Sequence, residues 1–259
     1  MEPLLRWAGG KRWQVPILKR AWYPHRHRRL VEPFCGGLSV ALALEPDAGV
    51  MNDANPHLVN FYRWCQRGLA LDIDLVPEDY YANRQWFNDL IAIGEHESRD
   101  AAQLFYYLNR FSFNGLCRFN ASGEFNVPEG RASSEVKPLP THLARHYLSR
   151  YTFTCGDFGD VPMEPDDFIY ADPPYDDGFT TYTGTAFTWD DQERVATLYA
   201  GHPGPVIITN HASERIQQLY RSLGYTVQLI SAPRRIAASG DRTRKMEVIA
   251  SNFPVDLVL

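Results

Sequence analysis

The chain of 259 residues is long enough to bury a full hydrophobic core, as one large domain or as a domain with an insert. Apolar residues make up 44% of it and charged residues 22%, which excludes an intrinsically disordered protein. Its formal net charge is −5, so an enzyme of this composition that acts on nucleic acid must concentrate its positive charge on one face.

The spacing of the cysteines and the length of the apolar runs indicate the cellular compartment in which the protein acts. The four cysteines lie far apart and form no C-x-x-C pair, which argues against a zinc site or a disulfide scaffold and fits a reducing cytoplasm. No apolar run is long enough to span a membrane, and no signal peptide is recognisable. We therefore expect a cytoplasmic protein without membrane contact.

Near its N-terminus the chain carries Trp7, then two glycines, then Lys11. The glycines let a backbone approach a ligand closely, Trp7 can cover an aromatic or cationic ligand, and Lys11 can meet a carboxylate. The alternative is a loop with a core tryptophan. A helix is expected over residues 13–22, and the basic run 25–29 is either a solvated face or a phosphate contact.

The segment 30–42 predicts a short strand, a turn at Gly36 and Gly37, and an apolar helix. This pattern is typical of the first βα turn of a dinucleotide-type fold, where glycines let a nucleoside-bearing ligand sit against the main chain. It lacks the GxGxxG spacing and the P-loop lysine, so neither NAD nor ATP is the first choice. A second strand, residues 49–52, ends at Asp53, an acid placed either to bond ribose hydroxyls or to cap the next helix.

From residue 57 to residue 148 helical periodicity dominates, which predicts a helical insert in the α/β sheet. Toward the end of this insert, two short arms flank the turn 120–123 and predict a β-hairpin. Arginine, asparagine and aromatic residues interleave in the arms, a composition suited to reading base edges in a DNA groove, with Arg118 as the natural guanine reader. The alternative is a hairpin without DNA contact. We expect a catalytic domain of residues 1–56 and 149–259 and a target-recognition insert of residues 57–148.

The most informative stretch joins a buried strand, residues 168–171, to Asp172, Pro173, Pro174 and Tyr175. Proline cannot continue a central strand, so the chain leaves the sheet at Asp172, at the strand end where open α/β sheets bind ligands. An aromatic amine such as the N6 amino group of adenine is a poor nucleophile, and two acceptors around its hydrogens favour the nucleophilic form. Asp172 supplies one acceptor, the Pro173 carbonyl can supply the other, and Tyr175 offers a face on which a flipped base can stack. The alternative is a proline turn with a chance acid.

After this stretch the α/β alternation resumes, with helices expected over residues 190–200 and 214–223 and strands over residues 205–209, 225–230 and 247–252. A basic loop before the last strand includes Arg244 and Lys245 and is either a phosphate clamp or a solvated loop. His142 and His146 have i,i+4 spacing but lack the glutamate of HExxH, so no metal site is expected.

Together these motifs resemble those of the Dam-type DNA adenine-N6 methyltransferases of bacteria and their phages, the D12 class. The resemblance extends over nearly the whole chain in matching order, and the block 109–130 is its most specific part. The other matching motifs are Trp7-Ala8-Gly9-Gly10-Lys11, Glu32-Pro33-Phe34-Cys35-Gly36-Gly37, Asn52-Asp53, Asp172-Pro173-Pro174-Tyr175, Thr209-Asn210-His211 and Thr243-Arg244-Lys245. One departure is Arg131-Ala132, which stands where the family can place an aromatic residue shortly after the hairpin proline.

The resemblance implies a Rossmann-like methyltransferase sheet, S-adenosylmethionine as methyl donor, a GATC target and a flipped adenine. The expected catalytic residues are Asp172, Pro173, Pro174 and Tyr175. By the family pattern Trp7, Lys11, Asp53 and Asp172 line the donor site, and the candidate set also includes Phe34, Gly36 and Asp157. By the same pattern Arg6, Leu116, Arg118 and Pro128 are base-reading positions, and the candidate DNA-binding set also includes Asn114, Asn120, Arg244 and Lys245.

The expected protein is therefore a monomeric enzyme that methylates adenine N6 in duplex DNA by direct displacement, without a metal or a covalent enzyme intermediate. Alternatives are the same chemistry on another DNA sequence, on RNA adenine, on cytosine N4 or on protein glutamine, and a catalytically silent DNA-binding module. The block 109–130 favours duplex DNA, and the intact Asp172 and Asp53 motifs argue against a silent module. The sequence leaves open a role in host regulation, repair marking or phage self-protection.

Overall fold

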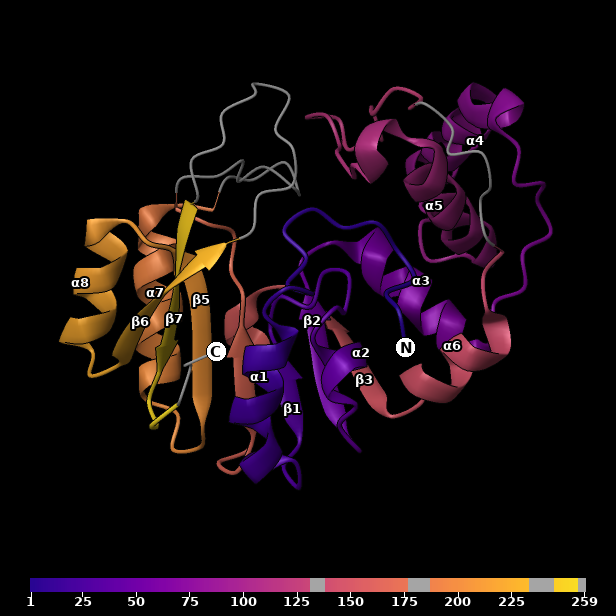
Figure 1. Ribbon diagram of the computed structural model, residues 1–259. Helices are drawn as coiled ribbons and strands as arrows, with labels where there is room; N and C mark the ends of the chain where they lie inside the picture. Colours follow the sequence, from indigo (N-terminus) through magenta and orange to yellow (C-terminus); the bar gives the residue numbers. More distant parts are fainter. Residues whose placement is uncertain (131–137, 177–186, 233–244, 256–259) are drawn as a thin grey trace.

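The computed structural model of the protein describes residues 1–130, 138–176, 187–232 and 245–255 (Figure 1). Arg244 and the departure at Arg131-Ala132 lie outside the described residues, as does the side chain of Lys245. A phosphate clamp formed by Arg244 and Lys245 therefore remains a prediction from the sequence.

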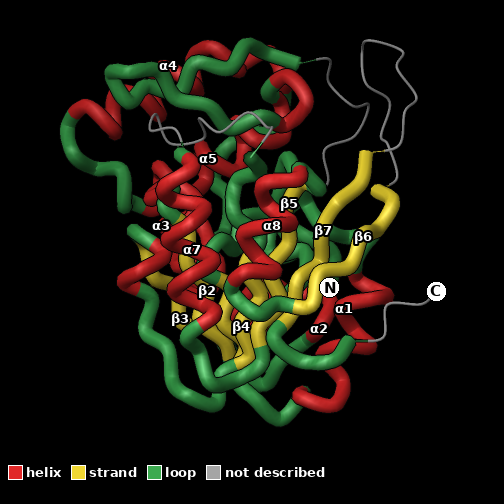
Figure 2. The backbone as a smooth tube through the Cα atoms, turned by 90° about the vertical axis from the view of Figure 1, so that its left-hand side faces the viewer, coloured by secondary structure: helices red, strands yellow, loops and turns green. Residues whose placement is uncertain are grey.

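A single sheet of seven strands, in the order β3-β2-β1-β4-β5-β7-β6, forms the centre of the molecule (Figure 2). The strands are β1 Leu30–Glu32, β2 Gly49–Asp53, β3 Tyr151–Cys155, β4 Phe168–Ala171, β5 Val206–His211, β6 Thr226–Ala232 and β7 Lys245–Ser251. Neighbouring strands are parallel, except that β7 runs antiparallel to β5 and β6. The strand order reverses between β1 and β4, and open α/β sheets bind ligands at the carboxyl ends of the strands at such a point. The sheet is the Rossmann-like sheet that the sequence predicts.

Helices cover both faces of the sheet, which explains why β4 is buried along its whole length. Alternate residues of this strand belong to separate cores, Phe168 and Tyr170 to one and Ile169 and Ala171 to the other. Helices α1 (Val15–Trp22) and α2 (Ala41–Leu44) contribute to the first core, and α7 (Trp189–Ala200) and α8 (Glu214–Ser222) to the second. Figure 2 shows the two pairs of helices on opposite sides of the strands.

Between β2 and β3 the described chain forms the helices α3 (Pro56–Arg67), α4 (Tyr80–Ala92), α5 (Arg99–Phe111) and α6 (Thr141–Leu148). Helix α3 contacts β2 and β3 as well as α5 and α6, so it connects the sheet to the other three helices. Helices α4 and α5 lie beyond the carboxyl ends of the strands (Figure 1). The described part of the region 57–148 contains these helices, and the division of the region from the catalytic domain remains a proposal.

The expected hairpin is present as a closed turn rather than as two regular strands. One antiparallel bridge joins Phe119 to Phe125, and the two rings meet edge to face at 5.7 Å between centroids. The Asn120 side chain folds back to accept hydrogen bonds from the backbone N–H groups of Ser122 and Glu124. Backbone hydrogen bonds also join the arms, from Asn120 N–H to the Glu124 carbonyl at 2.9 Å and from Asn126 N–H to the Arg118 carbonyl at 3.1 Å, so the hairpin is short but closed.

Candidate active site

Asp172 follows β4 directly, at the carboxyl end of the strand beside which the strand order reverses. The hydroxyl of Thr209, at the carboxyl end of β5, donates a hydrogen bond of 2.6 Å to Asp172 Oδ1. The Lys11 ammonium lies 2.9 Å from Asp172 Oδ2, and Lys11 is only 5% exposed. A carboxylate held by a hydroxyl and a buried cation has a defined orientation, and removing it would leave the Lys11 charge buried without its carboxylate partner.

Tyr175 is held at its hydroxyl, along one ring face and through the backbone before it. Its hydroxyl donates a hydrogen bond of 2.8 Å to Glu247 Oε2 on β7. The Lys11 Nζ atom lies 4.5 Å from the centre of the ring, in cation–π contact. The side-chain amide of Gln192 donates to the Pro174 carbonyl at 2.7 Å, which fixes the chain between the strand and the ring. Burial and the nearby Asp172 charge raise the pKa of Tyr175 well above its usual value, so the hydroxyl stays protonated.

The glycine turn and Asp53 lie at the carboxyl ends of β1 and β2 and are bonded to each other. Asp53 Oδ2 accepts the backbone N–H of Gly36 at 3.0 Å, and Oδ1 accepts that of Asn55 at 2.9 Å. Asn55, not Asp53, caps helix α3, because its side chain accepts from the first N–H groups of that helix. The alternative reading of Asp53 as the helix cap is therefore wrong. Burial raises the pKa of Asp53, while the N–H groups of Asn55 and Gly36 lower it.

Trp7 lies directly against the glycine turn. A Cβ atom added at Gly36, where φ is +44°, would lie 2.6 Å from the indole Nε1, and one added at Gly37 would lie 2.8 Å from Trp7 Cβ. The close packing of the indole therefore requires glycine at both positions. The sequence assigns Trp7 either to a ligand or to a core, and the structure places it half-buried beside the turn.

The two other candidate donor-site residues lie at the ends of β1 and β3. The Phe34 ring packs against Phe158 at 5.4 Å between centroids. Asp157 accepts the backbone N–H of Gly159 at 2.7 Å and forms an ion pair with Arg194. Burial alone would raise the pKa of Asp157, but the Arg194 guanidinium and the Gly159 N–H hold it below its usual value.

Glu32 ends β1, beside Asp172, and is 2% exposed. Burial raises its pKa well above the usual value, and the charge of Asp172 adds to this effect, although the Ala41 N–H group opposes it. Burial thus disfavours a second negative charge beside Asp172. Glu32 ends β1 at the same edge of the sheet at which residues 172–175 follow β4.

The model of the D12 class N6 adenine-specific DNA methyltransferase family matches residues 7–234. The chain belongs to this family. The resemblance noted in the sequence is thereby confirmed, and with it the expected class of enzyme, an adenine-specific DNA methyltransferase.

Three relatives show how far the similarity extends. A DNA adenine methylase of Vibrio cholerae is 34% identical over 274 residues, which cover 96% of this chain and 95% of that protein. The retron Ec67 DNA adenine methylase of Escherichia coli is 34% identical over 268 residues, 96% of this chain and 91% of that protein. A DNA N-6-adenine-methyltransferase of Escherichia phage P1 is 34% identical over 260 residues, but these cover only 33% of that protein and 92% of this chain.

Within this family member, the N-terminal segment and the hairpin region are joined by hydrogen bonds. The Asn109 side chain accepts from the Arg6 backbone N–H at 2.8 Å and donates to the Arg6 carbonyl at 2.7 Å. A Cβ atom added at Gly115 would lie 2.5 Å from Arg6 Cβ, so the two segments are in close contact. This brings Arg6 next to Asn114, which is exposed with φ of +55°, and to the half-buried Leu116. Three candidate DNA-binding residues thus lie together.

Arg118 and Asn120 lie on the hairpin turn and have different surroundings. Arg118 is exposed, and its Nε donates to the side chain of Asn126 at 2.8 Å, which orients the guanidinium. Asn120 forms hydrogen bonds with Ser122 and Glu124 within the turn, through both its side-chain oxygen and its side-chain nitrogen. The shape of the turn therefore depends on Asn120.

Pro128 is exposed on the returning arm, where its carbonyl accepts the backbone N–H of Phe113 at 2.9 Å. The aromatic ring of Phe113 is itself 50% exposed, at the same turn as Asn114. No motif in the sequence predicted a role for the Phe113 side chain. Its signal is an aromatic residue in a polar, glycine-containing turn.

Three partners of residues 172–175 were also not assigned from the sequence, nor was Gln14, which bonds to one of them: the partners are Gln192, Thr209 and Glu247. Thr209 was matched only as part of a motif. A polar residue at the end of an apolar strand next to β4 is the signal that could have identified it. Glu247 and Gln14 carry no comparable local signal, because their partners are far away along the chain.

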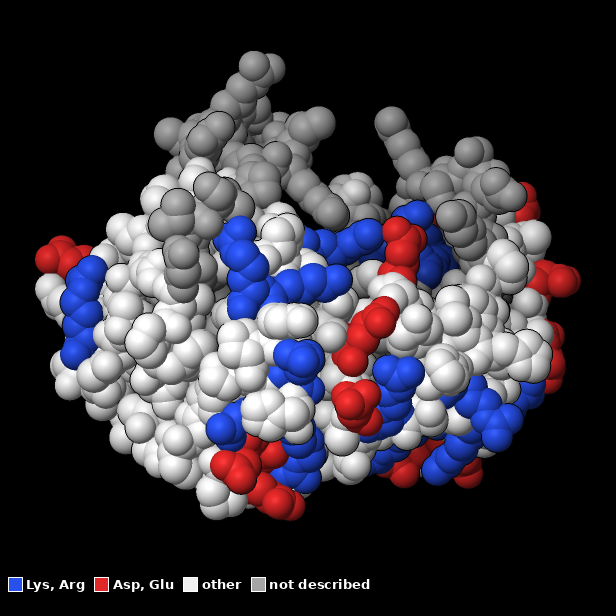
Figure 3. Space-filling model, turned by 60° about the horizontal axis from the view of Figure 1, so that its bottom comes forward, with Lys and Arg blue, Asp and Glu red and all other residues white. Residues whose placement is uncertain are grey.

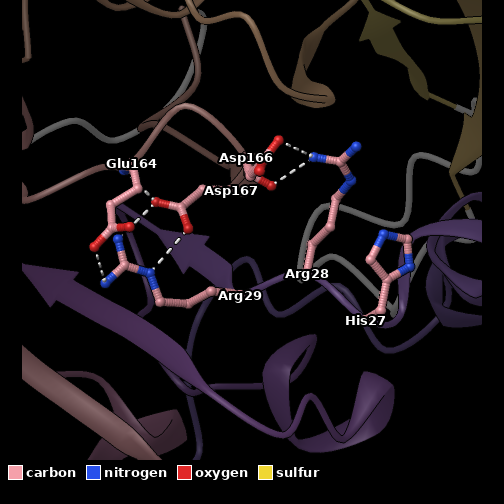
Figure 4. A pocket seen from close by; sticks show the side chains of 6 residues that line it. All are labelled: His27, Arg28, Arg29, Glu164, Asp166 and Asp167. Carbon is pink, nitrogen blue, oxygen red and sulfur yellow. Dashed lines mark hydrogen bonds and ion pairs between the residues drawn. The ribbon is translucent and has the colours of Figure 1, made fainter.

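A separate polar cavity of about 300 Å³ lies at the amino ends of β1 and β4, away from Asp172. Within it Arg28 forms an ion pair with Asp166, and Arg29 with Asp167 and Glu164 (Figure 4). Two cations of the basic run 25–29 are thus bound to acids of the same chain. Figure 3 likewise shows basic and acidic side chains close together on this lower face, so the described residues do not concentrate positive charge there.

The described part of the chain contains no group of three His, Cys, Asp or Glu side chains arranged to hold a metal ion. Within the same residues, no helix combines the length and the apolarity needed to cross a bilayer. The described cysteines are all free thiols, and burial raises the pKa of Cys35, which lies beside the glycine turn, well above its usual value.

Proposed function

We propose that this adenine-specific DNA methyltransferase acts on adenine N6 within GATC in duplex DNA. The observation that carries the proposal is the arrangement of Asp172, which is oriented by Thr209 and Lys11, next to the ring of Tyr175. Arg118, exposed on the hairpin turn, supports sequence-specific reading of a duplex. We also propose that the protein acts in the cytoplasm and as a monomer. Light scattering after size exclusion would test the monomeric state.

In this proposal Asp172 is a preorganised acceptor for the amino group of a flipped adenine. Thr209 and Lys11 fix the carboxylate before the base arrives, so little reorganisation is needed during reaction. The Pro173 carbonyl is the second acceptor, in a backbone stiffened by two prolines. Tyr175 stacks on the base. The neutral amine attacks without first losing a proton, so Asp172 acts mainly by hydrogen bonding.

The family and the fold imply S-adenosylmethionine, and the residues at the glycine turn fit such a ligand. We assign the donor site to Trp7, Lys11, Phe34, Gly36, Asp53, Asp157 and Asp172. Asp53 offers carboxylate oxygens that retain lone pairs for ribose hydroxyls beyond the two backbone N–H groups they accept. The Phe34 ring offers an apolar wall at the end of β1. When bound, S-adenosylmethionine supplies the activated methyl group.

Asp53→Ala is expected to weaken S-adenosylmethionine binding by about 1–3 kcal/mol, because ribose hydroxyls lose a charged partner. Calorimetric titration measures the effect. Asp53→Asn is the matched variant, since it keeps the shape and one acceptor oxygen beside Gly36. Unchanged affinity in both variants, with a lowered Tm in Asp53→Ala, would restrict Asp53 to holding the turn.

Arg118→Ala is expected to relax discrimination at one guanine by about 1–3 kcal/mol and to leave donor binding unchanged. Methylation rates on duplexes with single base substitutions measure this. Arg118→Lys should relax discrimination as well, because lysine cannot form a bidentate contact, whereas it would rescue a phosphate contact. Arg221→Ala, an exposed arginine on α8, is the control. A uniform loss across all sequences would identify Arg118 as a phosphate contact instead.

The proposed function is tested by expressing the chain in a host without GATC methylation and digesting the host DNA with methylation-sensitive GATC nucleases. A parallel assay measures tritium transfer from labelled donor into a GATC duplex and into the same duplex already methylated at N6. Transfer into DNA with unchanged GATC cleavage would show a different target sequence. Binding of DNA without transfer would show a silent module.

A further inference from the structure

Glu247 is an acid that the proposed mechanism does not use. It lies near the start of β7, where it pairs with His211 of β5 and Ile230 of β6 in the register of the sheet. Along β7, Ile249 belongs to the same core as Tyr170, whereas Val248 and Ala250 belong to the opposite core. Because side chains alternate along a strand, Glu247 faces the same side as Ile249, which is the side of α1.

Two hydrogen bonds converge on one oxygen of this carboxylate. Glu247 Oε2 accepts from the Tyr175 hydroxyl at 2.8 Å and from the Gln14 side-chain amide at 2.8 Å. Gln14 is fully buried at the start of α1. Burial raises the pKa of Glu247, while the Lys11 charge and the bonds from Tyr175 and Gln14 lower it. A half-buried carboxylate that accepts two hydrogen bonds on one oxygen has little freedom to move.

The ring of Tyr175 is therefore restrained at three points. Glu247 holds its hydroxyl end, Lys11 covers one of its faces at 4.5 Å, and Gln192 fixes the backbone before it through the Pro174 carbonyl. A base that stacks on this ring must use the face opposite Lys11. The same Lys11 ammonium contacts Asp172 at 2.9 Å, so one ammonium group contacts both the ring and the carboxylate.

We propose that Glu247 is a positioning residue for base capture: through the Tyr175 hydroxyl it holds the ring so that its open face receives the flipped adenine beside Asp172. This inference rests on the proposed function. The competing role is a purely structural link between α1 and β7 through Gln14. The two roles use different bonds of the same carboxylate, so single substitutions separate them.

Tyr175→Phe removes only the bond between the ring and Glu247, and Gln14→Met removes only the bond to α1. If Glu247 positions the ring, Glu247→Ala and Tyr175→Phe should each lower the single-turnover rate about tenfold, as expected for a hydrogen bond to a charged group. Glu247→Gln should lower it only about threefold, because a neutral acceptor forms a bond roughly half as strong. Gln14→Met should stay near the wild-type rate.

The double variant Glu247→Ala with Tyr175→Phe is expected to lose no more than either single variant, since both remove one bond. Fluorescence of 2-aminopurine at the target position should show impaired base capture in these variants. Glu193→Gln, an exposed glutamate on α7, is the control for loss of one negative charge. Wild-type rates in Tyr175→Phe, together with a loss in Gln14→Met that matches Glu247→Ala, would overturn the inference.

The same set of variants is also compared by Tm, which requires no activity. A wild-type protein that methylates no duplex would overturn the proposed function. If the Tm changes of Glu247→Ala and Tyr175→Phe are then still non-additive, the coupling between Tyr175 and Glu247 stands. Additive changes in Tm would overturn the positioning role whether or not the protein methylates DNA.

Discussion

Asp172→Asn is expected to lower the single-turnover rate of methyl transfer by about 10²–10³-fold while duplex DNA still binds. Asparagine keeps the shape of the side chain but replaces a charged acceptor with a weaker one. It can also turn its NH₂ group toward the adenine amine, which needs an acceptor. The substitution further leaves Lys11, which is 5% exposed, without its carboxylate partner. The charge balance around residue 172 therefore changes together with the hydrogen-bond acceptor.

The measurement uses excess enzyme, tritiated donor and a GATC duplex, with DNA binding followed separately by fluorescence anisotropy. Asp176→Asn is a matched control, because Asp176 lies just beyond the same motif and forms an ion pair with Arg215. This control should keep near-normal single-turnover chemistry. Near-normal methylation by Asp172→Asn would show that the mechanism is wrong and that the stretch 172–175 is a proline turn after a strand.

Acidification from pH 7 to pH 4 is expected to remove about 3 kcal/mol of unfolding free energy through His57 alone. Burial lowers the pKa of His57 to about 4, and the nearby His96 adds to this effect. The unfolded chain binds this proton near pH 6.5, whereas the folded chain binds it only near pH 4. The contribution of His57 to the unfolding free energy is therefore fully present above pH 6.5 and decreases as the pH falls toward 4.

The packing around His57 explains the shift and connects it to the hairpin turn. The imidazole is 8% exposed and stacks on Phe119 at 4.7 Å between centroids, with Phe87 edge to face at 5.2 Å. Its Nδ1 atom is buried without a hydrogen-bond partner among the described residues. Phe119 belongs to the turn that carries Arg118, so the buried His57 ring is part of the packing that supports this turn.

Urea unfolding at pH 7 and pH 4 tests this expectation in the wild type and in His57→Phe. The difference in unfolding free energy between the wild type and His57→Phe should change by about 3 kcal/mol between these pH values, because phenylalanine fills the aromatic cluster without titrating. His142→Phe, at an exposed position on α6, should follow the wild type. An identical pH dependence in His57→Phe and the wild type would show that other groups account for the acid sensitivity.

Local patterns in the sequence predicted much of the fold and of the candidate site. The strand before Gly36, the strand that ends at Asp53 and the strand that ends at Asp172 are all present, within one or two residues of the expected bounds. These patterns are local because a glycine turn, an apolar run and a proline each restrict the backbone at their own position. The family assignment drawn from the same motifs is confirmed.

Other features required the tertiary structure. The turn 120–123 resembles a hairpin in sequence, and only the structure shows that the Asn120 side chain adds two hydrogen bonds to the backbone bonds at its tip. Asp53 and Asn55 are both acceptable helix caps by composition, and only the geometry assigns the cap to Asn55. Such competition between neighbouring polar groups depends on which donors the backbone presents in space.

The sequence by itself determined the class of sheet, the end of β4 before Asp172 and the family, because each depends on short segments whose backbone state is set locally. Only the tertiary structure decided which side chains surround residues 172–175. Glu247 lies 72 residues after Tyr175 and 233 after Gln14, and the three meet because β7 runs antiparallel beside β5. The order and direction of strands depend on burying both faces of the sheet at once, so no single segment carries that information.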